Sequence, residues 1–238
     1  MKISFILPAH NEADFIASTI KAIHTSAAGL EYEIVVADDA STDRTREIAG
    51  ELGATVVRHE RRQIAATRNL GAAAAQGGYL FFIDADTRPS LATVGEAVES
   101  LKAGAAGGGA PIHFDEPIPL YARLIQPPTS VLFRLFRLTG GCFFFCTRAA
   151  FQASGGWDES LYASEEIALA KLIKRNGSFV IVRSPVLTSG RKLRTFTASQ
   201  LVATLWRAVF TRGRSLQTRD NLELRYGERP PDRPRDGR

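Results

Sequence analysis

Residues 33–43 of this 238-residue chain read EIVVADDASTD, an apolar run that ends in two aspartates and leads into small polar residues. The apolar part, Glu33–Ala37, predicts a buried strand. Ser41, Thr42 and Asp43 all favour the start of a helix, and Gly53 marks its end. A strand followed at once by a capped helix is the repeating unit of parallel sheets covered by helices.

The same unit recurs on both sides of this stretch. Strands are predicted at Ile3–Leu7, Ala54–Val57 and Tyr79–Ile83, and helices from an N-cap at Asn11 to before Gly29, at about Gln63–Ala75, and from beyond Pro89 to about Lys102. The alternation predicts an α/β fold with a Rossmann-like, mostly parallel central sheet flanked by helices.

The second half of the chain is less regular. In order, we expect a glycine-rich turn at Gly104–Gly109, a strand at Ala110–Phe114, two short helices within Ile118–Leu138, a strand at Gly141–Cys146, a helix at Ser164–Arg175, a last strand at Phe179–Val182 and an amphipathic helix at Thr195–Phe210. No linker or repeat interrupts this order, so residues 1–227 are expected to form one domain. The Pro-, Arg- and Asp-rich residues 228–238 are expected to be a disordered tail.

The composition is that of an ordinary globular protein, with 45% hydrophobic and 23% charged residues. It excludes a disordered chain, a disulfide-stapled secreted module and a collagen-like fibre. Cys142 and Cys146 are the only cysteines, and on a strand their Cα atoms would lie roughly 13 Å apart, too far for a disulfide. Free thiols, no signal-peptide pattern and no run of ~18 apolar residues lead us to expect a cytoplasmic protein.

The formal net charge of +5 is unevenly distributed. Residues 1–189 carry 18 basic and 20 acidic side chains, a net −2, whereas residues 190–238 carry 12 basic and 5 acidic, a net +7. Two apolar stretches with isolated arginines, Ile118–Leu138 and Gln200–Leu216, either pack on the sheet or lie at a membrane interface. The interfacial alternative makes the protein a peripheral one at the inner face of the cell membrane. No nucleic-acid partner is expected.

Acidic side chains gather where two predicted strands end. Asp38 and Asp39 follow the second strand, and Asp84 and Asp86 follow the fourth. The carboxyl ends of the strands form the ligand-binding edge of an open α/β sheet. Because Asp84 and Asp86 are two residues apart, they point to the same side of an extended backbone and could share one hard divalent cation.

These acids belong to five motifs that occur in a fixed order. They are Pro8-Ala9-His10-Asn11-Glu12, Asp38-Asp39-Ala40-Ser41-Thr42-Asp43, Arg68-Asn69-Leu70-Gly71, Asp84-Ala85-Asp86, and Gly155-Gly156-Trp157-Asp158-Glu159 with Ser164-Glu165-Glu166-Ile167-Ala168-Leu169 beyond it. Over roughly residues 1–190 the chain resembles the family 2 glycosyltransferases of the GT-A fold. The resemblance implies an inverting, metal-dependent enzyme that moves a hexosyl or N-acetylhexosaminyl group from a nucleoside diphosphate sugar to a hydroxyl acceptor.

The resemblance also implies a role for each matching residue. The nucleotide-sugar half, about 1–115, would bind the donor through Pro8, Ala9, Glu12, Asp38, Asp39, Ser41, Arg68 and Asp84. Asp38 or Asp39 would accept hydrogen bonds from the base, Arg68 would lie near the phosphates and Asp84 near the ribose. Asp86 would hold Mg²⁺ or Mn²⁺ against the diphosphate, whose charge grows as the glycosidic bond breaks.

The acceptor half, about 116–227, would supply the general base. In the family this is generally the Asp of a Glu-Asp pair at the start of a helix, whereas this chain has Glu165-Glu166. Helix neighbours diverge by about 100°, so one of the two is expected to face the sugar, and alignment favours Glu166 over Glu165. Asp158 and Trp157 would contact the acceptor, although Trp157 is equally suited to packing.

The segment after the last predicted strand contains Arg191 and Lys192 but no histidine. The two cations either clamp the diphosphate directly or belong to a solvated basic loop.

Two other functions stay open. The departure at Glu165-Glu166 permits a sugar-nucleotide-binding protein with a decayed base. A sugar-nucleotide pyrophosphorylase uses a similar sheet but normally begins with a glycine-rich phosphate loop, where this chain has Pro8-Ala9-His10-Asn11-Glu12. The sequence names neither the sugar, the base nor the acceptor.

Overall fold

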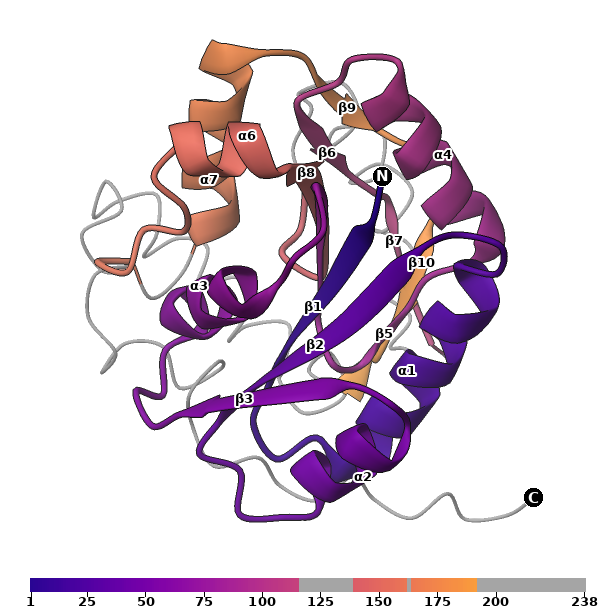
Figure 1. Cartoon of the computed structure of the whole chain (residues 1–238), viewed down its shortest axis with the longest axis vertical. Coiled ribbons are helices and arrows are strands. Elements are labelled where there is room, and N and C mark those ends of the chain that lie inside the picture. Colours follow the sequence, from indigo (N-terminus) through magenta and orange to yellow (C-terminus); the bar gives the residue numbers. More distant parts are fainter. Residues whose placement is uncertain (116–138, 162–163, 192–238) are drawn as a thin grey trace, which may run out of the picture.

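A computed structural model describes residues 1–115, 139–161 and 164–191 (Figure 1). A seven-stranded sheet has the order β3-β2-β1-β4-β8-β6-β9, and a three-stranded sheet beside it has the order β5-β10-β7. The strands of the large sheet are β1 Ile3–Ala9, β2 Tyr32–Asp39, β3 Thr55–His59, β4 Tyr79–Ile83, β6 Gly107–Gly109, β8 Phe143–Thr147 and β9 Phe179–Ile181. Those of the small sheet are β5 Thr87–Arg88, β7 Ile112–Phe114 and β10 Val186–Thr188.

The predicted, mostly parallel central sheet is confirmed. Strands β1 to β4 run parallel, and β8 runs antiparallel to both β4 and β6. Because β1, β2 and β4 are parallel neighbours, their carboxyl ends meet at one edge of the sheet. The aspartates that follow β2 and β4 therefore lie at the same edge of the sheet, with the end of β1 between them.

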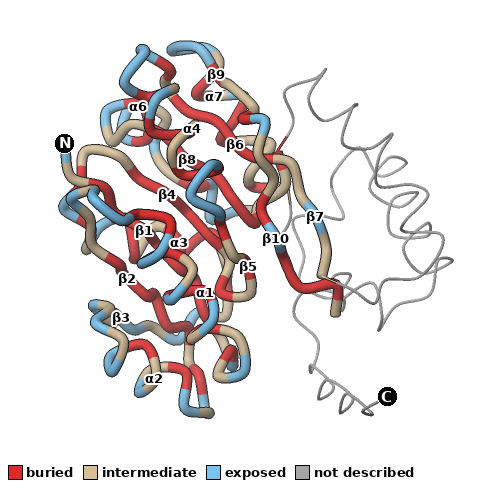
Figure 2. The backbone as a smooth tube through the Cα atoms, turned by 90° about the vertical axis from the view of Figure 1, so that its right-hand side faces the viewer, coloured by how far each residue is buried: buried red, intermediate tan, exposed pale blue. Residues whose placement is uncertain are grey.

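Helices cover both faces of the sheet, and the alternation of side chains along each strand supplies both cores. The helices are α1 Ala13–Ser26, α2 Thr45–Glu51, α3 Ile64–Ala74, α4 Leu91–Lys102, α6 Arg148–Ala153 and α7 Glu165–Asn176. One core joins α1, α2 and α4 to side chains such as Phe81, and the other joins α3, α6 and α7 to side chains such as Phe82. Figure 2 shows the resulting pattern, with buried strands between partly exposed helices.

Three expectations about local structure are wrong. Asn11 does not cap α1, which begins at Ala13, because the backbone of Asn11 is left-handed (φ 51°). Gly107–Gly109 form strand β6 rather than a turn. A Cβ at Gly108 would collide with the Val180 carbonyl and the Phe145 ring, so glycine is needed where β8 and β9 close on β6.

The third error concerns the C-terminal half. Strand β9 is not the last, because β10 follows it, and helix α6 has no counterpart among the predicted elements. Strand β5 was not predicted either. All three elements are short, and β10 takes its place by pairing with β5 and β7. The helices expected within Ile118–Leu138 and Thr195–Phe210, and the tail 228–238, lie outside the described residues.

The structure also bears on the two cysteines and on whether a helix could span a membrane. Cys142 and Cys146 are free and buried, and burial raises the pKa of both thiols. Within residues 1–115, 139–161 and 164–191, no helix has the length and apolarity required to cross a membrane.

Candidate active site

Strained backbone gathers at the carboxyl edge of the sheet. Among the described residues, the non-glycine positions with positive φ are Asn11, Ala40, Arg62 and Ser164. The first two follow β1 and β2, and the others precede α3 and α7. Such conformations cost of order 1–3 kcal/mol each and concentrate at functional sites. This edge is therefore the part of the molecule where a site is expected.

Ala40 offers a direct measure of this strain. Its φ of 57° is one that glycine adopts without penalty. We expect Ala40→Gly to stabilise the protein by about 0.5–1 kcal/mol, the relief of left-handed strain less the added freedom of the unfolded chain. Urea denaturation measures the change. Ala17→Gly, inside α1, is the control and should destabilise by a similar amount; a destabilising Ala40→Gly would contradict the strain.

The loops after β1 and β2 are tied to each other. Pro8 and Ala9 are buried at the end of β1, in register with Ala37 and Asp38. The Ser41 hydroxyl accepts a hydrogen bond from the Asn11 backbone (2.9 Å) and is itself buried. Ser41 thus shapes the predicted nucleotide pocket by holding its loops together.

The two aspartates after β2 differ in what they contact. Asp39 accepts from the backbone of Arg62 (2.7 Å) and Gln63 (2.8 Å) and from the Thr67 hydroxyl (3.0 Å). Asp38 is buried and accepts from the backbone of Ser41 through Oδ2, while its Oδ1 has no hydrogen-bond partner among the described residues. Of the pair, Asp38 keeps an acceptor oxygen for a ligand.

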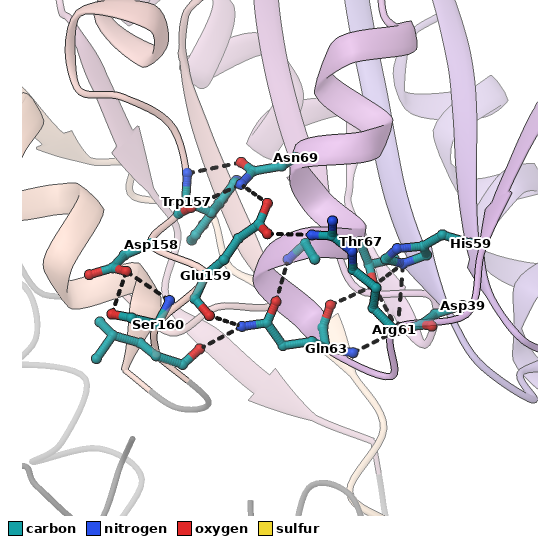
Figure 3. A network of polar contacts seen from close by, with 12 residues as sticks. Asp39, His59, Arg61, Gln63, Thr67, Asn69, Trp157, Asp158, Glu159 and Ser160 are labelled. Carbon is teal, nitrogen blue, oxygen red and sulfur yellow. Dashed lines mark hydrogen bonds and ion pairs between the residues drawn. The ribbon is translucent and has the colours of Figure 1, made fainter. Parts of the chain in front are cut away.

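Figure 3 shows that α3 also fixes the loop expected to face the acceptor. The Gln63 side-chain amide donates to the Glu159 carbonyl, and the Asn69 amide donates to the Trp157 carbonyl (2.9 Å) and the Glu159 carboxylate (3.0 Å). Asp158 is exposed and accepts from Ser160 (2.9 Å from its backbone), which closes a tight turn. No local pattern indicates the role of Gln63, whereas Asn69 belongs to the motif Arg68-Asn69-Leu70-Gly71.

The expected acceptor contact through the Trp157 ring is not supported by its position. Trp157 is only 2% exposed and packs edge-on against Phe82 and Phe144, with ring centroids 5.1 and 5.2 Å away. The Arg68 guanidinium lies 4.6 Å from the centre of the ring. The ring is thus buried by packing, the alternative that the sequence left open.

Arg68 and Glu165, for which donor and acceptor roles were expected, form a buried ion pair. Both side chains are 0% exposed, and Arg68 Nη1 lies 2.8 Å from Glu165 Oε1. Arg68 also donates to Asp84 Oδ1 (2.9 Å) and to the Gly141 carbonyl (2.7 Å). In this structure the Arg68 guanidinium is buried and contacts protein groups, and the Glu165 carboxylate is buried against Arg68.

Glu166 lies next to this pair and is only half-buried. A Cβ built on Gly141 would lie 3.7 Å from the Glu166 carboxyl carbon and 3.1 Å from Arg68 Nη2. The Glu166 carboxyl therefore lies close to Arg68, the residue that donates a hydrogen bond to Asp84. It lies in the first turn of α7, where the helix dipole interacts favourably with an acidic side chain. A half-buried carboxylate at this edge has the placement and charge of a general base.

The acids after β4 each meet an arginine. The Asp84 side chain is 32% exposed, and the Asp86 side chain is 11% exposed and lies 2.9 Å from Arg191. Arg191 also donates to Glu12 (2.8 Å). Burial alone would lower the pKa of Arg191, but its hydrogen bond to Glu12 and the charges of Asp86, Glu12 and Asp84 raise it. Arg191 therefore stays a cation inside the site; Lys192 lies outside the described residues.

The Asp84 and Asp86 carboxylates suit a divalent metal ion whose remaining coordination positions are filled by a bound ligand. No group of three or more His, Cys, Asp or Glu side chains able to hold a metal occurs within the described part of the chain. Asp84 and Asp86 supply hard oxygens from one short turn, and Mg²⁺ typically takes one or two carboxylates plus phosphate oxygens and water. The donor set suits such an ion, with a diphosphate providing the missing ligands.

The chain is similar in sequence to known glycosyltransferases. The family model described as Glycosyl transferase family 2 matches residues 4–154. The dolichol-phosphate mannosyltransferase of Pyrococcus furiosus is 32% identical over 109 residues, 44% of this chain and 31% of that protein. The chondroitin synthase of Escherichia coli is 30% identical over 105 residues, 42% of this chain and 15% of that protein. The matches thus span about a third or less of these relatives.

Solved structures share the fold at lower identity. The mannosyltransferase PcManGT of Pyrobaculum calidifontis, in complex with GDP-Man and Mn²⁺, is 20% identical with a TM-score of 0.66, over 88% of this chain and 64% of that one. S. aureus TarS 1-349 is 16% identical with a TM-score of 0.63, over 94% and 76%. The predicted GT-A fold is thereby confirmed. With more than half of its length matched by the family model, the chain belongs to glycosyltransferase family 2.

Proposed function

We propose that this chain transfers a hexosyl or N-acetylhexosaminyl group from a nucleoside diphosphate sugar to a hydroxyl acceptor, with inversion and with Mg²⁺ or Mn²⁺. The observation that carries the proposal is that Asp84, after β4, and Glu166, at the start of α7, both lie close to Arg68 Nη2, with Asp86 two residues beyond Asp84. Asp84 and Asp86 suit the binding of a diphosphate with its metal ion, and Glu166 suits the role of general base. Neighbouring structures hold GDP-Man with Mn²⁺ and UDP-GlcNAc, which supports the donor class.

The donor pocket is proposed to lie between the ends of β1 and β2. Pro8 and Ala9 form its wall, and the available oxygen of Asp38 accepts a hydrogen bond from the base. Asp84, which is paired with Arg68, is proposed to contact the ribose. Arg191, which is paired with Glu12, is proposed to lie near the phosphates. A buried carboxylate with a remaining lone pair favours a ligand that donates an N–H.

Asp86, with Asp84, would hold the metal. When bound, the ion neutralises the charge that grows on the diphosphate leaving group. Arg191, a cation at the same place, adds a fixed charge and hydrogen bonds toward the same oxygens. Together they lower the cost of breaking the bond between the anomeric carbon and the phosphate oxygen.

Glu166 is proposed as the base. It takes the proton of the acceptor hydroxyl while the hydroxyl oxygen attacks the anomeric carbon, and the diphosphate leaves from the opposite face with the bonding electron pair. Attack opposite the leaving group inverts the anomeric configuration. Glu165, fixed on Arg68, keeps the start of α7 in place while Glu166 accepts the proton.

The acceptor is proposed to be lipid-linked or close to a membrane, with the single domain over 1–227 bound peripherally. The net +7 of residues 190–238 supports this, as does a relative named for dolichol phosphate. Binding to vesicles with about 30% anionic lipid should be strong in low salt and fall steeply as salt rises. Equal sedimentation with neutral vesicles, or none with anionic ones, would contradict this location.

A panel of UDP, GDP and TDP sugars with Mn²⁺ or Mg²⁺ tests the proposed donor class. A true donor stabilises the folded state by mass action, about 2.7 kcal/mol at 100 times its Kd, so one base and one sugar should raise the melting temperature in a metal-dependent way. No shift with any member would count against the proposal.

Product analysis separates the two remaining functions. Slow release of nucleoside diphosphate in the presence of donor indicates an active transferase or hydrolase. Binding without release indicates a sugar-nucleotide-binding protein with a decayed base, and formation of a nucleoside triphosphate from added pyrophosphate indicates a pyrophosphorylase. Our account expects the diphosphate.

A further inference from the structure

Arg191 holds the carboxylate that the metal needs. A single guanidinium nitrogen, Nη2, lies 2.9 Å from Asp86 Oδ2 and 2.8 Å from Glu12 Oε1. The three side chains are 16%, 11% and 6% exposed, so water screens these contacts only weakly. In the donor-free protein the cation beside Asp86 is therefore part of the chain itself.

The position of Arg191 is built rather than adventitious. Its guanidinium lies 4.6 Å from the centre of the Phe15 ring, a favourable place for a cation. The Ser189 backbone donates to the Asp86 carbonyl (3.2 Å), and Thr188 on β10 pairs with Thr87 on β5, so the chain just before Arg191 is fastened to the turn that carries Asp86. The pairing of β10 with β5 in the small sheet thus positions Arg191 next to Asp86.

Two cations cannot hold the same carboxylate equally well. A divalent ion on Asp86 would face the charge of Arg191 at close range, and Arg191 would have to leave Asp86 for another anion. The diphosphate of a donor is such an anion, and a guanidinium binds it with paired hydrogen bonds. Glu12 keeps Arg191 close to the site during this exchange.

We propose that Arg191 occupies Asp86 until the diphosphate arrives, so that the metal binds tightly only together with the nucleotide. The inference rests on the proposed function, since the metal and the diphosphate both belong to it. It assigns Arg191 a role in the order of binding: the arginine makes the donor-free site a poor metal site and becomes a diphosphate ligand in the complex.

Titration with Mn²⁺ alone, followed by electron paramagnetic resonance of the free ion, tests this without any turnover. Without nucleotide, Arg191→Gln is expected to bind Mn²⁺ about tenfold more tightly than the wild-type chain, because Asp86 has lost its competing cation. UDP or GDP should raise the Mn²⁺ affinity of the wild-type chain more than that of the variant. Unchanged or weaker Mn²⁺ binding by Arg191→Gln, or an equal nucleotide effect in both proteins, would overturn the proposal.

Two controls make the gain specific, and a second variant covers a loss of folding. Arg88→Gln, on β5, removes the same charge near the site and should change Mn²⁺ affinity by less than about threefold; an equal gain would overturn the proposal. Asp86→Asn added to Arg191→Gln should abolish the gain in Mn²⁺ affinity. If the double variant kept that gain, the proposal would be overturned. If Arg191→Gln melts before the titration temperature, Arg191→Ala takes its place with the same expected gain.

The result is independent of whether transfer occurs. Failure of the proposed function would appear as no nucleoside diphosphate released from any sugar donor, whatever the Mn²⁺ affinities. Failure of the present inference would appear as a wild-type chain that turns over its donor while Arg191→Gln shows no gain in Mn²⁺ affinity.

Discussion

Glu166→Gln is expected to lower kcat for sugar transfer by about 10³-fold, the usual range for loss of a general base, while donor and metal binding stay intact. The glutamine fills the same space but cannot take a proton from the acceptor hydroxyl. Glu166 lies at the half-buried start of α7, beside Gly141 and Arg68, so the substitution leaves the packing of the helix unchanged. Single-turnover kinetics with saturating donor measure the chemical step.

Glu166→Asp is the matched control. It keeps the carboxylate on a shorter side chain, the residue that the family generally has at this place, so it should retain far more activity than Glu166→Gln. Glu165→Gln is expected to behave differently. It breaks a fully buried ion pair with Arg68 and should destabilise the protein by about 3–5 kcal/mol. Full transfer activity in Glu166→Gln would remove this residue from the mechanism.

Asp86→Asn should have the other large effect, a loss of about 10³-fold in kcat/KM for the donor, equal to several kcal/mol of lost leaving-group stabilisation. The amide is a weaker metal ligand and carries no charge. It also frees Arg191 from its partner at 2.9 Å. Donor binding should no longer depend on Mn²⁺, which calorimetry of UDP or GDP sugar binding with and without the ion will show.

Asp14→Asn provides the control for Asp86→Asn. It removes the same charge from the exposed first turn of α1, and both donor affinity and its dependence on Mn²⁺ should stay as in the wild-type chain. If Asp86→Asn bound the donor with the same dependence on Mn²⁺, the metal would have to be held elsewhere.

Much of the fold could be predicted from the sequence, because it depends on local patterns. Strand β4 was predicted with its observed bounds, since Tyr79–Ile83 is a continuous apolar run between glycines and aspartates. Strand β6 was missed because three glycines carry no apolar pattern. They form a strand only because β8 and β9 close on either side, and that proximity is set by contacts distant in sequence.

The site was predictable at the level of motifs but not of contacts. Patterns placed Asp84 and Asp86 at one edge of the sheet but left open whether Arg191 joins them or lies in a solvated loop, and the structure brings Arg191 to Asp86. The roles of Arg68 and Glu165 depend on an ion pair between residues 97 positions apart, which no local pattern encodes. Likewise, the burial of Glu165 depends on which side of α7 meets Arg68, and the burial of Trp157 depends on its contacts with Phe82 and Phe144.

The central claim is metal-dependent transfer from a nucleoside diphosphate sugar at the edge formed by β1, β2 and β4. The most direct test uses the nucleotide sugar that raises the melting temperature of the chain. Release of its nucleoside diphosphate is followed while Mn²⁺ is removed with EDTA and then restored. We predict release by the wild-type chain that stops with EDTA, returns with Mn²⁺, and is lost in both Asp86→Asn and Glu166→Gln. Release that persists in EDTA and in both variants would contradict the account.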